Sequence, residues 1–398
     1  MMIPSRVALG GTALMIALAS PALQGEAAEW AAESSLGLRG EYNSNLLLSA
    51  LPHDPVYGYW VSPGTKFTGS TENLEVSGRA AADFIQYFGG SDRSLTNLYF
   101  PLSVQYKTER ETFAFDGGFT RDNTLMGELR QTGVVLAFTQ RNLWNLAPSW
   151  THALTERWAL QAGYQYSDAT YENGVPLGLV DYTLHGGSGA VLYQPTELDE
   201  VKMTGSYTNF HAPQGNDLRS ELYAATVSVT HRFSESIVAT VRGGPTYVRS
   251  AVGSGTARLS DSQTVWVGNA SLAKKWEDAS FNLEVAREIN PSGFGLLLQT
   301  DRVGANLSKD FSEQWTMSLD ASVVLASSLA SQILTTSFPL NQFVYVSPQV
   351  IWRFSQWWAL DFKYSYANRQ VESTNEAAFA NIASVTLTYF PPKLSVGR

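Results

Sequence analysis

Apolar and polar residues alternate along nearly the whole chain. The segment WALDFKYSY (358–366) places Trp358, Leu360 and Phe362 on one side of an extended strand, and Asp361 and Lys363 on the other. The segments that follow FSEQ and TER repeat this pattern. Successive side chains of a β-strand point to opposite faces, so each run predicts a strand with one apolar and one polar face.

The connections between these runs are of two kinds. One is a short polar turn flanked by aromatic or apolar residues, as in RFSQWW, DFSEQW, RFSESI, LTERW, KKWEDASF, STEN, KTERE and QPTELDE. The other is longer and rich in Gly, Pro, Asn and Ser, as in SALPHDPVYG, GGSDRSLTN, ENGVPLGL, HAPQGNDLRS, RSAVGSGTARLSDS and INPSGFG. Short and long connections alternate. Outer-membrane barrels combine short periplasmic turns with longer extracellular loops. The pattern therefore predicts an all-β fold, a transmembrane up-and-down antiparallel β-barrel.

Tryptophans gather beside the short turns. A soluble β-sandwich also alternates apolar and polar residues, but it has no reason to crowd indoles at its strand ends. A membrane interface does, because an indole has an apolar ring and a polar N–H. We predict that a ring of aromatic side chains lies at the periplasmic membrane interface; its members are Trp158, Trp276, Trp315, Trp352, Trp357 and Trp358.

We count about 18 strands, and 16 to 20 remain compatible with the sequence. The segment Gln131–Thr151 fits either one long strand or a strand with a folded loop. Pro148 within it needs a position where no backbone donor is required. A barrel of this size encloses an aqueous lumen unless a segment fills it. We expect no dedicated plug domain, although loops are free to fold inward.

The two ends of the chain lie outside the predicted barrel. Residues 1–27 read as a secretory signal peptide: Arg6, an apolar run, then small residues that offer cleavage after Ala22 or Ala27. A retained anchor is the alternative. The barrel is expected over residues 28–390. Its last run, FANIASVTLTYF, is typical of the strand that barrel-assembly machinery recognises. Two prolines then predict an end to strand pairing and a short periplasmic tail over residues 391–398.

Composition narrows the choice of function. Charged residues make up only 16% of the chain and aromatic residues 12%. The mean hydropathy of −0.12 is near zero, as expected when apolar and polar strand faces contribute equally. A net charge of −9 argues against a nucleic-acid partner. There is no cysteine, which excludes disulfides and thiolate metal sites.

The polar strand faces supply the candidate functional residues. If the apolar faces meet lipid, the following side chains are predicted to line the pore: Glu75, Arg79, Asp83, Asp116, Lys202, Arg232, Arg242, Glu284, Glu288, Arg302, Asp320, Arg353, Asp361 and Lys363. Their signs are mixed, whereas a selective ion pore needs a ring of one sign. A polar wall for a weakly charged solute such as a sugar polymer fits better. The alternative is that these charges only pair across strands to tolerate an aqueous interior.

Catalysis finds little support. His185 lies near Ser188 in LHGGSGA, but the strand–turn–helix setting of a nucleophile elbow is missing. Neither His pairs nor carboxylates have the spacing of a metal site. We therefore expect a non-enzymatic protein without cofactor or metal.

The segments APSWTHALTERWALQAGYQYSDATYE, GEYNSNLLL and SVTLTYFPPKLSVGR together make the chain resemble the outer-membrane β-barrel porin family found near exopolysaccharide and exosortase gene clusters. The resemblance implies a conduit for a secreted polysaccharide in the Gram-negative outer membrane, partnered by a periplasmic polysaccharide-export protein. Two alternatives stay open: a passive diffusion porin for small hydrophilic solutes, and a closed structural or surface-binding barrel. In each case outer-membrane lipid and lipopolysaccharide are the expected surroundings.

Overall fold

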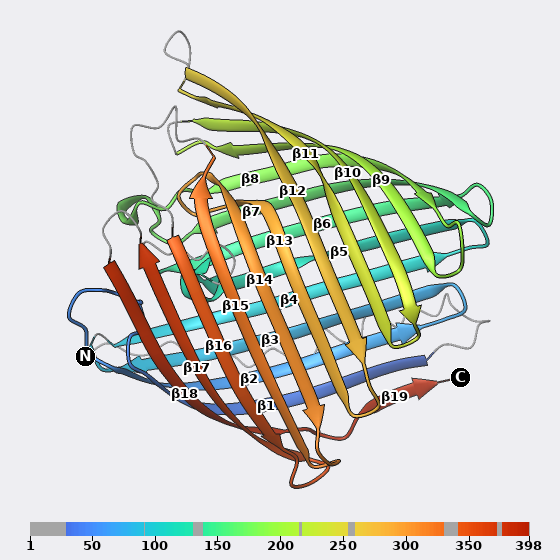
Figure 1. Cartoon of the computed structure of the whole chain (residues 1–398). Helices are drawn as coiled ribbons and strands as arrows, with labels where there is room; N and C mark the ends of the chain where they lie inside the picture. The colour runs from blue at the N-terminus through green and yellow to red at the C-terminus, as the bar shows by residue number, and fades with distance from the viewer. Residues whose placement is uncertain are drawn as a thin grey trace, which may run out of the picture.

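The protein is built almost entirely of long β-strands (Figure 1). The computed structural model describes residues 29–90, 92–129, 138–214, 217–253, 259–329, 341–371 and 376–397. The predicted signal peptide lies outside these residues. The strands are β1 (Glu29–Asn43), β2 (Val56–Ser70), β3 (Leu74–Phe88), β4 (Arg93–Lys107), β5 (Glu111–Asn123), β6 (Gln140–Ala153), β7 (Trp158–Tyr171), β8 (Tyr182–Tyr193), β9 (Asp199–Ala212), β10 (Leu218–Ser234), β11 (Ile237–Val252), β12 (Leu259–Lys275), β13 (Ala279–Pro291), β14 (Leu297–Asp310), β15 (Trp315–Ser328), β16 (Asn341–Trp352), β17 (Trp358–Val371), β18 (Glu376–Tyr389) and β19 (Leu394–Gly397). Two short helices, α1 (Thr124–Gly127) and the 3₁₀ turn η1 (Val175–Leu177), lie in connections. Among the described residues, no helix has the length and apolarity needed to cross a membrane.

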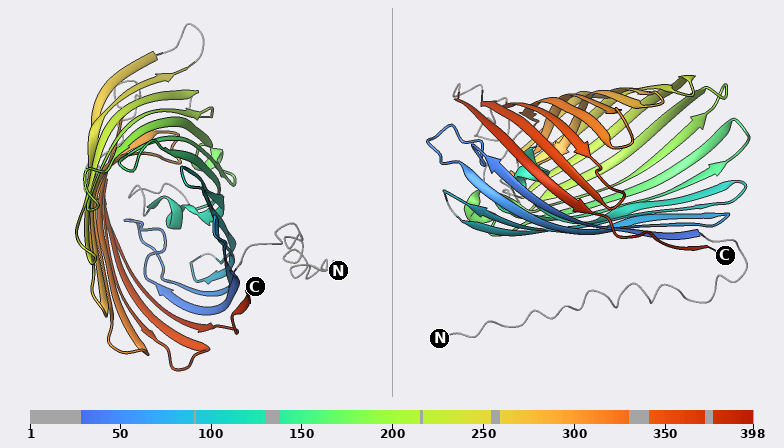
Figure 2. Two further views of the ribbon diagram at one scale, coloured as in Figure 1. Left: turned by 90° about the vertical axis from the view of Figure 1, so that its right-hand side faces the viewer. Right: turned by 90° about the horizontal axis from the view of Figure 1, so that it is seen from below.

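The sheet closes on itself. From β1 to β18 each strand pairs antiparallel with the next along the chain. β1 also pairs with β18, from Leu36 opposite Tyr389 to Asn43 opposite Ile382. Figure 2 shows the resulting oval ring. The predicted up-and-down barrel of about 18 strands is confirmed.

Six of the eight short connections share one hydrogen bond. A Ser or Thr hydroxyl accepts from the backbone N–H three residues on, a geometry that favours a tight polar turn. The bonds are Thr71–Leu74 at 3.1 Å, Thr108–Glu111 at 3.0 Å, Thr155–Trp158 at 3.1 Å, Thr196–Asp199 at 3.1 Å, Ser312–Trp315 at 3.2 Å and Ser355–Trp358 at 3.1 Å. The short turns gather at the lower right end in Figure 1, opposite the long loops.

Pro148 lies inside β6. The β6–β7 register runs from Leu146 opposite Tyr166 to Ser149 opposite Gly163, and neither Ala147 nor Pro148 pairs with β7, although both lie opposite residues of β5. A proline fits such a gap because it has no N–H to donate. In the segment Gln131–Thr151, β6 starts only at Gln140; residues 131–137 lie outside the described part of the chain.

The C-terminal tail differs from expectation. Pairing with β1 stops at Tyr389, as the two prolines predict, but it resumes in β19, where Leu394 lies opposite Ala32 and Gly397 opposite Glu29. Lys393 Nζ contacts Glu33 Oε1 at 2.9 Å beside the interruption. The prolines therefore make a local break in the closing seam, which β19 then extends.

Candidate functional site

Segments folded into the ring identify its inner face. Leu48, from the β1–β2 connection, and Leu129, just after α1, pack against Phe343 and Tyr345 of β16. Figure 2 shows α1 inside the ring. The face of β16 that carries Phe343 and Tyr345 is therefore the inner one, and the strand registers carry this assignment around the barrel.

By this register, thirteen of the fourteen candidate pore residues share the inner face, Arg232 among them. Twelve of these lie well within the barrel wall: Glu75, Arg79, Asp83, Asp116, Lys202, Arg242, Glu284, Glu288, Arg302, Asp320, Asp361 and Lys363. The other two candidates lie at the short-turn end. Arg232, close to the end of β10, contacts the Glu197 carbonyl at 3.4 Å, and Arg353 follows β16 and donates to Thr316 Oγ1 at 2.8 Å.

A charged cluster joins β1 to β17 across the closing seam. The Arg39 guanidinium donates to Glu41 and lies 4.5 Å over the Trp60 ring. On β17, the Asp361 carboxylate accepts from Gln349 Nε2 at 2.6 Å. Arg39 Nε and Asp361 Oδ1 are buried without a hydrogen-bond partner among the described residues.

Arg39 and Glu41 were missed by the sequence reasoning. In LGLRGEY they alternate with Leu38 and Tyr42, so the same period of two that selected Asp361 and Lys363 also marks these two residues. Together with Lys363 and Trp60 they line a pocket of about 200 Å³ next to α1.

A second cluster ties α1 to the wall. Asn123 caps the helix by accepting from Met126 N at 3.0 Å. Arg141 makes a bidentate contact with Asp122, Nε–Oδ1 at 3.0 Å and Nη2–Oδ2 at 2.8 Å. Both side chains are almost fully buried.

Glu128 reaches further across the barrel. Its carboxyl group accepts from the Tyr171 hydroxyl and from Gly293 N at 3.3 Å, in the β13–β14 connection. Burial raises the pKa of Glu128 above its ordinary value, although the Tyr171 hydrogen bond opposes this shift. Glu128 therefore links two connections to each other and to β7.

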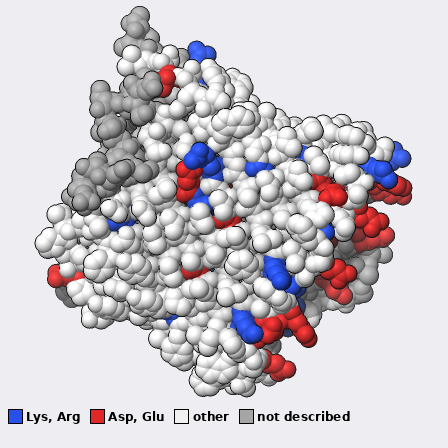
Figure 3. Space-filling view, in the orientation of Figure 1, with Lys and Arg blue, Asp and Glu red and all other residues white. Residues whose placement is uncertain are grey.

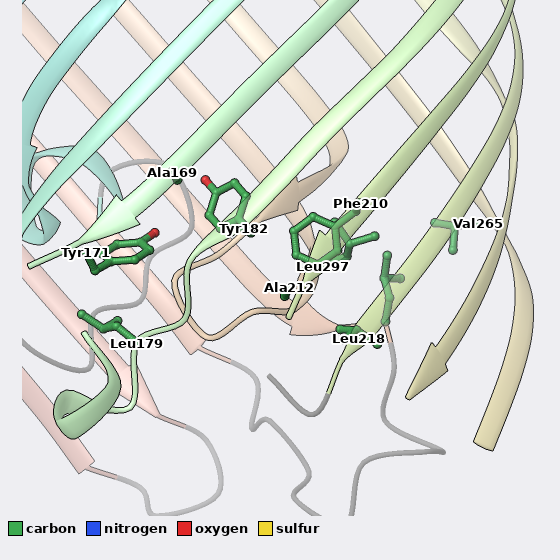
Figure 4. Close-up of a cluster of buried hydrophobic side chains, with 10 residues drawn as sticks. Ala169, Tyr171, Leu179, Tyr182, Phe210, Ala212, Leu218, Val265 and Leu297 are labelled. Carbon is green, nitrogen blue, oxygen red and sulfur yellow. The ribbon is translucent and has the colours of Figure 1, made fainter. Parts of the chain in front are cut away.

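Apolar side chains pack together at the long-loop end. Leu179, which follows η1, packs with Tyr182, Phe210, Leu218 and Leu297 in one cluster (Figure 4). Phe210 is fully buried. The long connections are thus part of a packed core inside the barrel mouth, and the free lumen is narrower than the ring of strands.

The opposite wall is polar and carries little charge. A depression of about 350 Å³ is lined by Gln165, Ser206, Thr208, Thr226, Arg242, Asn269, Glu288 and Asn290, among others. Gln165 donates to Thr208 at 3.1 Å and Arg242 to Thr226 at 3.3 Å. Neither β7 nor β8, both fully described, has a charged residue on its inner face. Hydroxyl and amide groups of this kind can exchange hydrogen bonds with a hydroxylated solute.

His185 and Ser188 do not form a pair. They are three residues apart on β8, so their side chains point to opposite faces, with His185 outward. Within the residues that the structure describes, no group of three or more His, Asp or Glu side chains is placed to hold a metal ion.

The outer face is largely apolar, with the Arg287–Asp301 ion pair as an exception, and aromatic pairs mark its short-turn end. Trp315 stacks on Trp352 with ring centroids 5.4 Å apart, Trp158 on Tyr193 at 4.4 Å, and Trp358 meets Tyr389 at 4.8 Å.

Two further tryptophans of the predicted ring lie at the same end. Lys274 Nζ lies 4.6 Å from the Trp276 ring, and Trp357 lies in the β16–β17 turn. In Figure 3 charged side chains gather at the edge with the short turns and leave most of the visible outer face uncharged.

Neither a protein-family model nor a curated protein sequence matches this chain. Among solved structures, it is similar to OccAB4 of Acinetobacter baumannii, with 10% identity, 94% of this chain and 100% of that one covered, and a TM-score of 0.45. For OccK7 (OpdD) of Pseudomonas aeruginosa the identity is 11%, the alignment covers 93% of this chain and 99% of that one, and the TM-score is 0.45. For a loop-deletion mutant of OmpT, an outer membrane protein of Vibrio cholerae, the identity is 13%, the alignment covers 91% of this chain and 99% of that one, and the TM-score is 0.37.

The chain's own strand registers define its class. It is an up-and-down β-barrel: a closed, antiparallel sheet of 18 strands with almost no helix among the described residues.

Proposed function

We propose that the chain is an outer-membrane porin whose lumen passes hydrophilic solutes. The observation that carries this proposal is the opposite character of the two barrel faces. The outer face is largely apolar and carries aromatic side chains near both ends, as a bilayer requires. The inner face carries the charged, hydroxyl and amide side chains described above.

We further propose that the solute is a polysaccharide that is being secreted from the cell. Support comes from the hydroxyl and amide wall near β7–β10, which carries little charge and suits neutral sugar rings, and from the sequence resemblance. A passive diffusion porin for small solutes is the second candidate. The inward packing of Leu48, Leu129 and Leu179 favours it, because a narrowed lumen passes small solutes more readily than a polymer.

Planar-bilayer conductance of the purified protein tests the porin. Ser206→Trp puts a large side chain on the inner face and should lower single-channel conductance; Tyr207→Trp, one residue away on the outer face, should leave it unchanged. A protein that inserts but never conducts would instead indicate a closed structural barrel.

Deletion of the gene distinguishes the two cargo classes. A polysaccharide conduit predicts loss of the secreted polymer, with intermediates retained in the periplasm. A diffusion porin predicts normal secretion together with slower uptake of small sugars. Because conductance is measured separately, polysaccharide export can be refuted while the porin function is still supported.

A further inference from the structure

A belt of aromatic side chains follows the outer face in the middle or the long-loop half of most strands. Neighbouring rings lie close together: Tyr42–Tyr57 at 5.4 Å, Tyr59–Phe88 at 5.7 Å, Phe100–Phe119 at 6.4 Å, Phe119–Trp144 at 4.8 Å, Tyr207–Tyr223 at 5.1 Å and Tyr223–Tyr247 at 6.5 Å. Trp266 of β12 continues the belt, and Tyr366 and Phe379 resume it on β17 and β18. Where it runs near the long-loop ends of the strands, such a belt marks contact with lipid headgroups.

The belt is interrupted over β13–β16, whose residues are all described. In the long-loop halves of these strands the outward residues are Arg287, Ile289, Gln299, Asp301, Val323, Leu325, Ser327, Gln342 and Val344, none of them aromatic. We call this surface the belt-free face. The aromatic pair of Trp315 and Trp352 at the other end of the same strands is present, so only the long-loop half lacks its interfacial rings.

An ion pair replaces the aromatic side chains on the belt-free face. Arg287 of β13 and Asp301 of β14 lie directly opposite each other in the ladder. Their contact is bidentate, Nε–Oδ1 at 2.5 Å and Nη2–Oδ2 at 2.8 Å, and the side chains are 50% and 33% exposed. Towards the short-turn end, Val285, Val303 and Val323 adjoin the pair in a shallow apolar groove. The groove combines small apolar side chains with one fixed charge of each sign.

We propose that the belt-free face binds a second copy of this chain around a two-fold axis normal to the membrane. Arg287 and Asp301 lie side by side on adjacent antiparallel strands at the same rung. A two-fold axis normal to the membrane exchanges left and right on the facing surfaces of the two copies. Arg287 of one copy therefore meets Asp301 of the other, and Asp301 of the first copy meets Arg287 of the second. The surface is therefore self-complementary in charge, as an isologous interface requires.

The available area fits a modest dimer. Four strands about 4.8 Å apart give a surface roughly 19 Å wide. Over the whole apolar band, about 25 Å tall and so including the short-turn halves of β13–β16 below the belt-free face, this surface is roughly 500 Å² per copy. About 1,000 Å² in total is at the lower limit for a specific interface. Burial of this face between two barrels also explains the missing belt, since a surface that does not meet headgroups gains nothing from interfacial rings.

Thiol cross-linking in the outer membrane tests the dimer, because the natural chain has no cysteine. Val303→Cys places a thiol on the belt-free face beside the proposed axis, and Val227→Cys is the matched control on β10 within the belted surface. A short bis-maleimide should convert the Val303→Cys protein to a covalent dimer and leave the Val227→Cys protein monomeric.

Charge exchange identifies the contact. Adding Arg287→Asp to Val303→Cys opposes acidic groups across the axis and should abolish the dimer. Exchange of both charges, Arg287→Asp with Asp301→Arg, should restore it. Conductance of each variant reports whether the barrel has folded and inserted.

A conducting Val303→Cys protein that stays monomeric would overturn the proposal and leave lipid as the occupant of the belt-free face. So would equal cross-linking at both thiol positions, or failure of the double exchange to restore the dimer. The proposal takes the barrel to be embedded in a membrane, so it depends on the proposed function; a conducting monomer would refute the dimer alone.

Discussion

Replacement of Arg141 by Met should destabilise the barrel strongly. The Arg141 and Asp122 side chains are only 5% and 8% exposed, and their bidentate contact is nearly free of solvent. Removal of the guanidinium leaves the Asp122 carboxylate buried beside Glu128. Loss of one partner of a buried ion pair typically costs about 3–5 kcal/mol. The second change, Asp122→Asn, removes the stranded charge and should recover about half of that loss, with a coupling of roughly 1–3 kcal/mol.

An exposed ion pair of the same barrel provides the control. Arg121 Nη2 contacts Glu172 Oε1 at 2.6 Å, but the side chains are 27% and 48% exposed. Arg121→Met should therefore cost about 1 kcal/mol or less. The assay is urea unfolding of the purified barrel in lipid vesicles, followed by electrophoretic mobility. Equal losses for Arg141→Met and Arg121→Met would show that burial does not govern these pairs and would refute the reasoning.

Three further predictions concern the two ends of the barrel. Joint replacement of Trp315, Trp357 and Trp358 by Ala should lower assembly yield while conductance of assembled barrels is unchanged, because these rings lie at the outer rim; altered conductance with normal assembly would contradict the rim assignment. Burial raises the pKa of the Glu128 carboxyl group. This group therefore binds its proton more tightly when the α1 segment is packed inside the barrel, the docked state, than when the segment is released. Docking should therefore be strongest at low pH and weaken as pH rises through the raised pKa; hydrogen exchange of residues 123–129 should show this, and Glu128→Gln should remove the pH dependence. Ser312→Ala removes the turn hydrogen bond to Trp315 N and should cost about 0.5–1.5 kcal/mol in urea unfolding; no change would show that the hydroxyl is dispensable.

The strands and turns could be predicted because their signals are local. A period of two assigned Asp361 and Lys363 to the face opposite Trp358, and the ladder with β18 agrees. The recurring Ser or Thr of the short turns makes a bond only three residues long, as at Ser312 and Ser355. Such features need no knowledge of the rest of the fold.

The filling of the lumen could not be predicted in the same way. Leu48 packs against Phe343, and Glu128 accepts from Gly293 N, across large separations in the sequence. No periodic pattern indicates that a polar connection turns inward, since loops on the surface have the same composition. The resumed pairing of β19 was missed for a related reason: two prolines predict a local break, but only the partner strand β1 decides whether pairing continues.

The central claim is that lipid covers one face of every strand and water the other. β9 offers a direct test, because single cysteines can be introduced one at a time into a chain that has none. In barrels reconstituted in vesicles, a water-soluble thiol reagent should label Thr204→Cys, Ser206→Cys and Thr208→Cys rapidly. Met203→Cys and Tyr207→Cys should be protected. Uniform labelling, or labelling of the second set alone, would contradict the account.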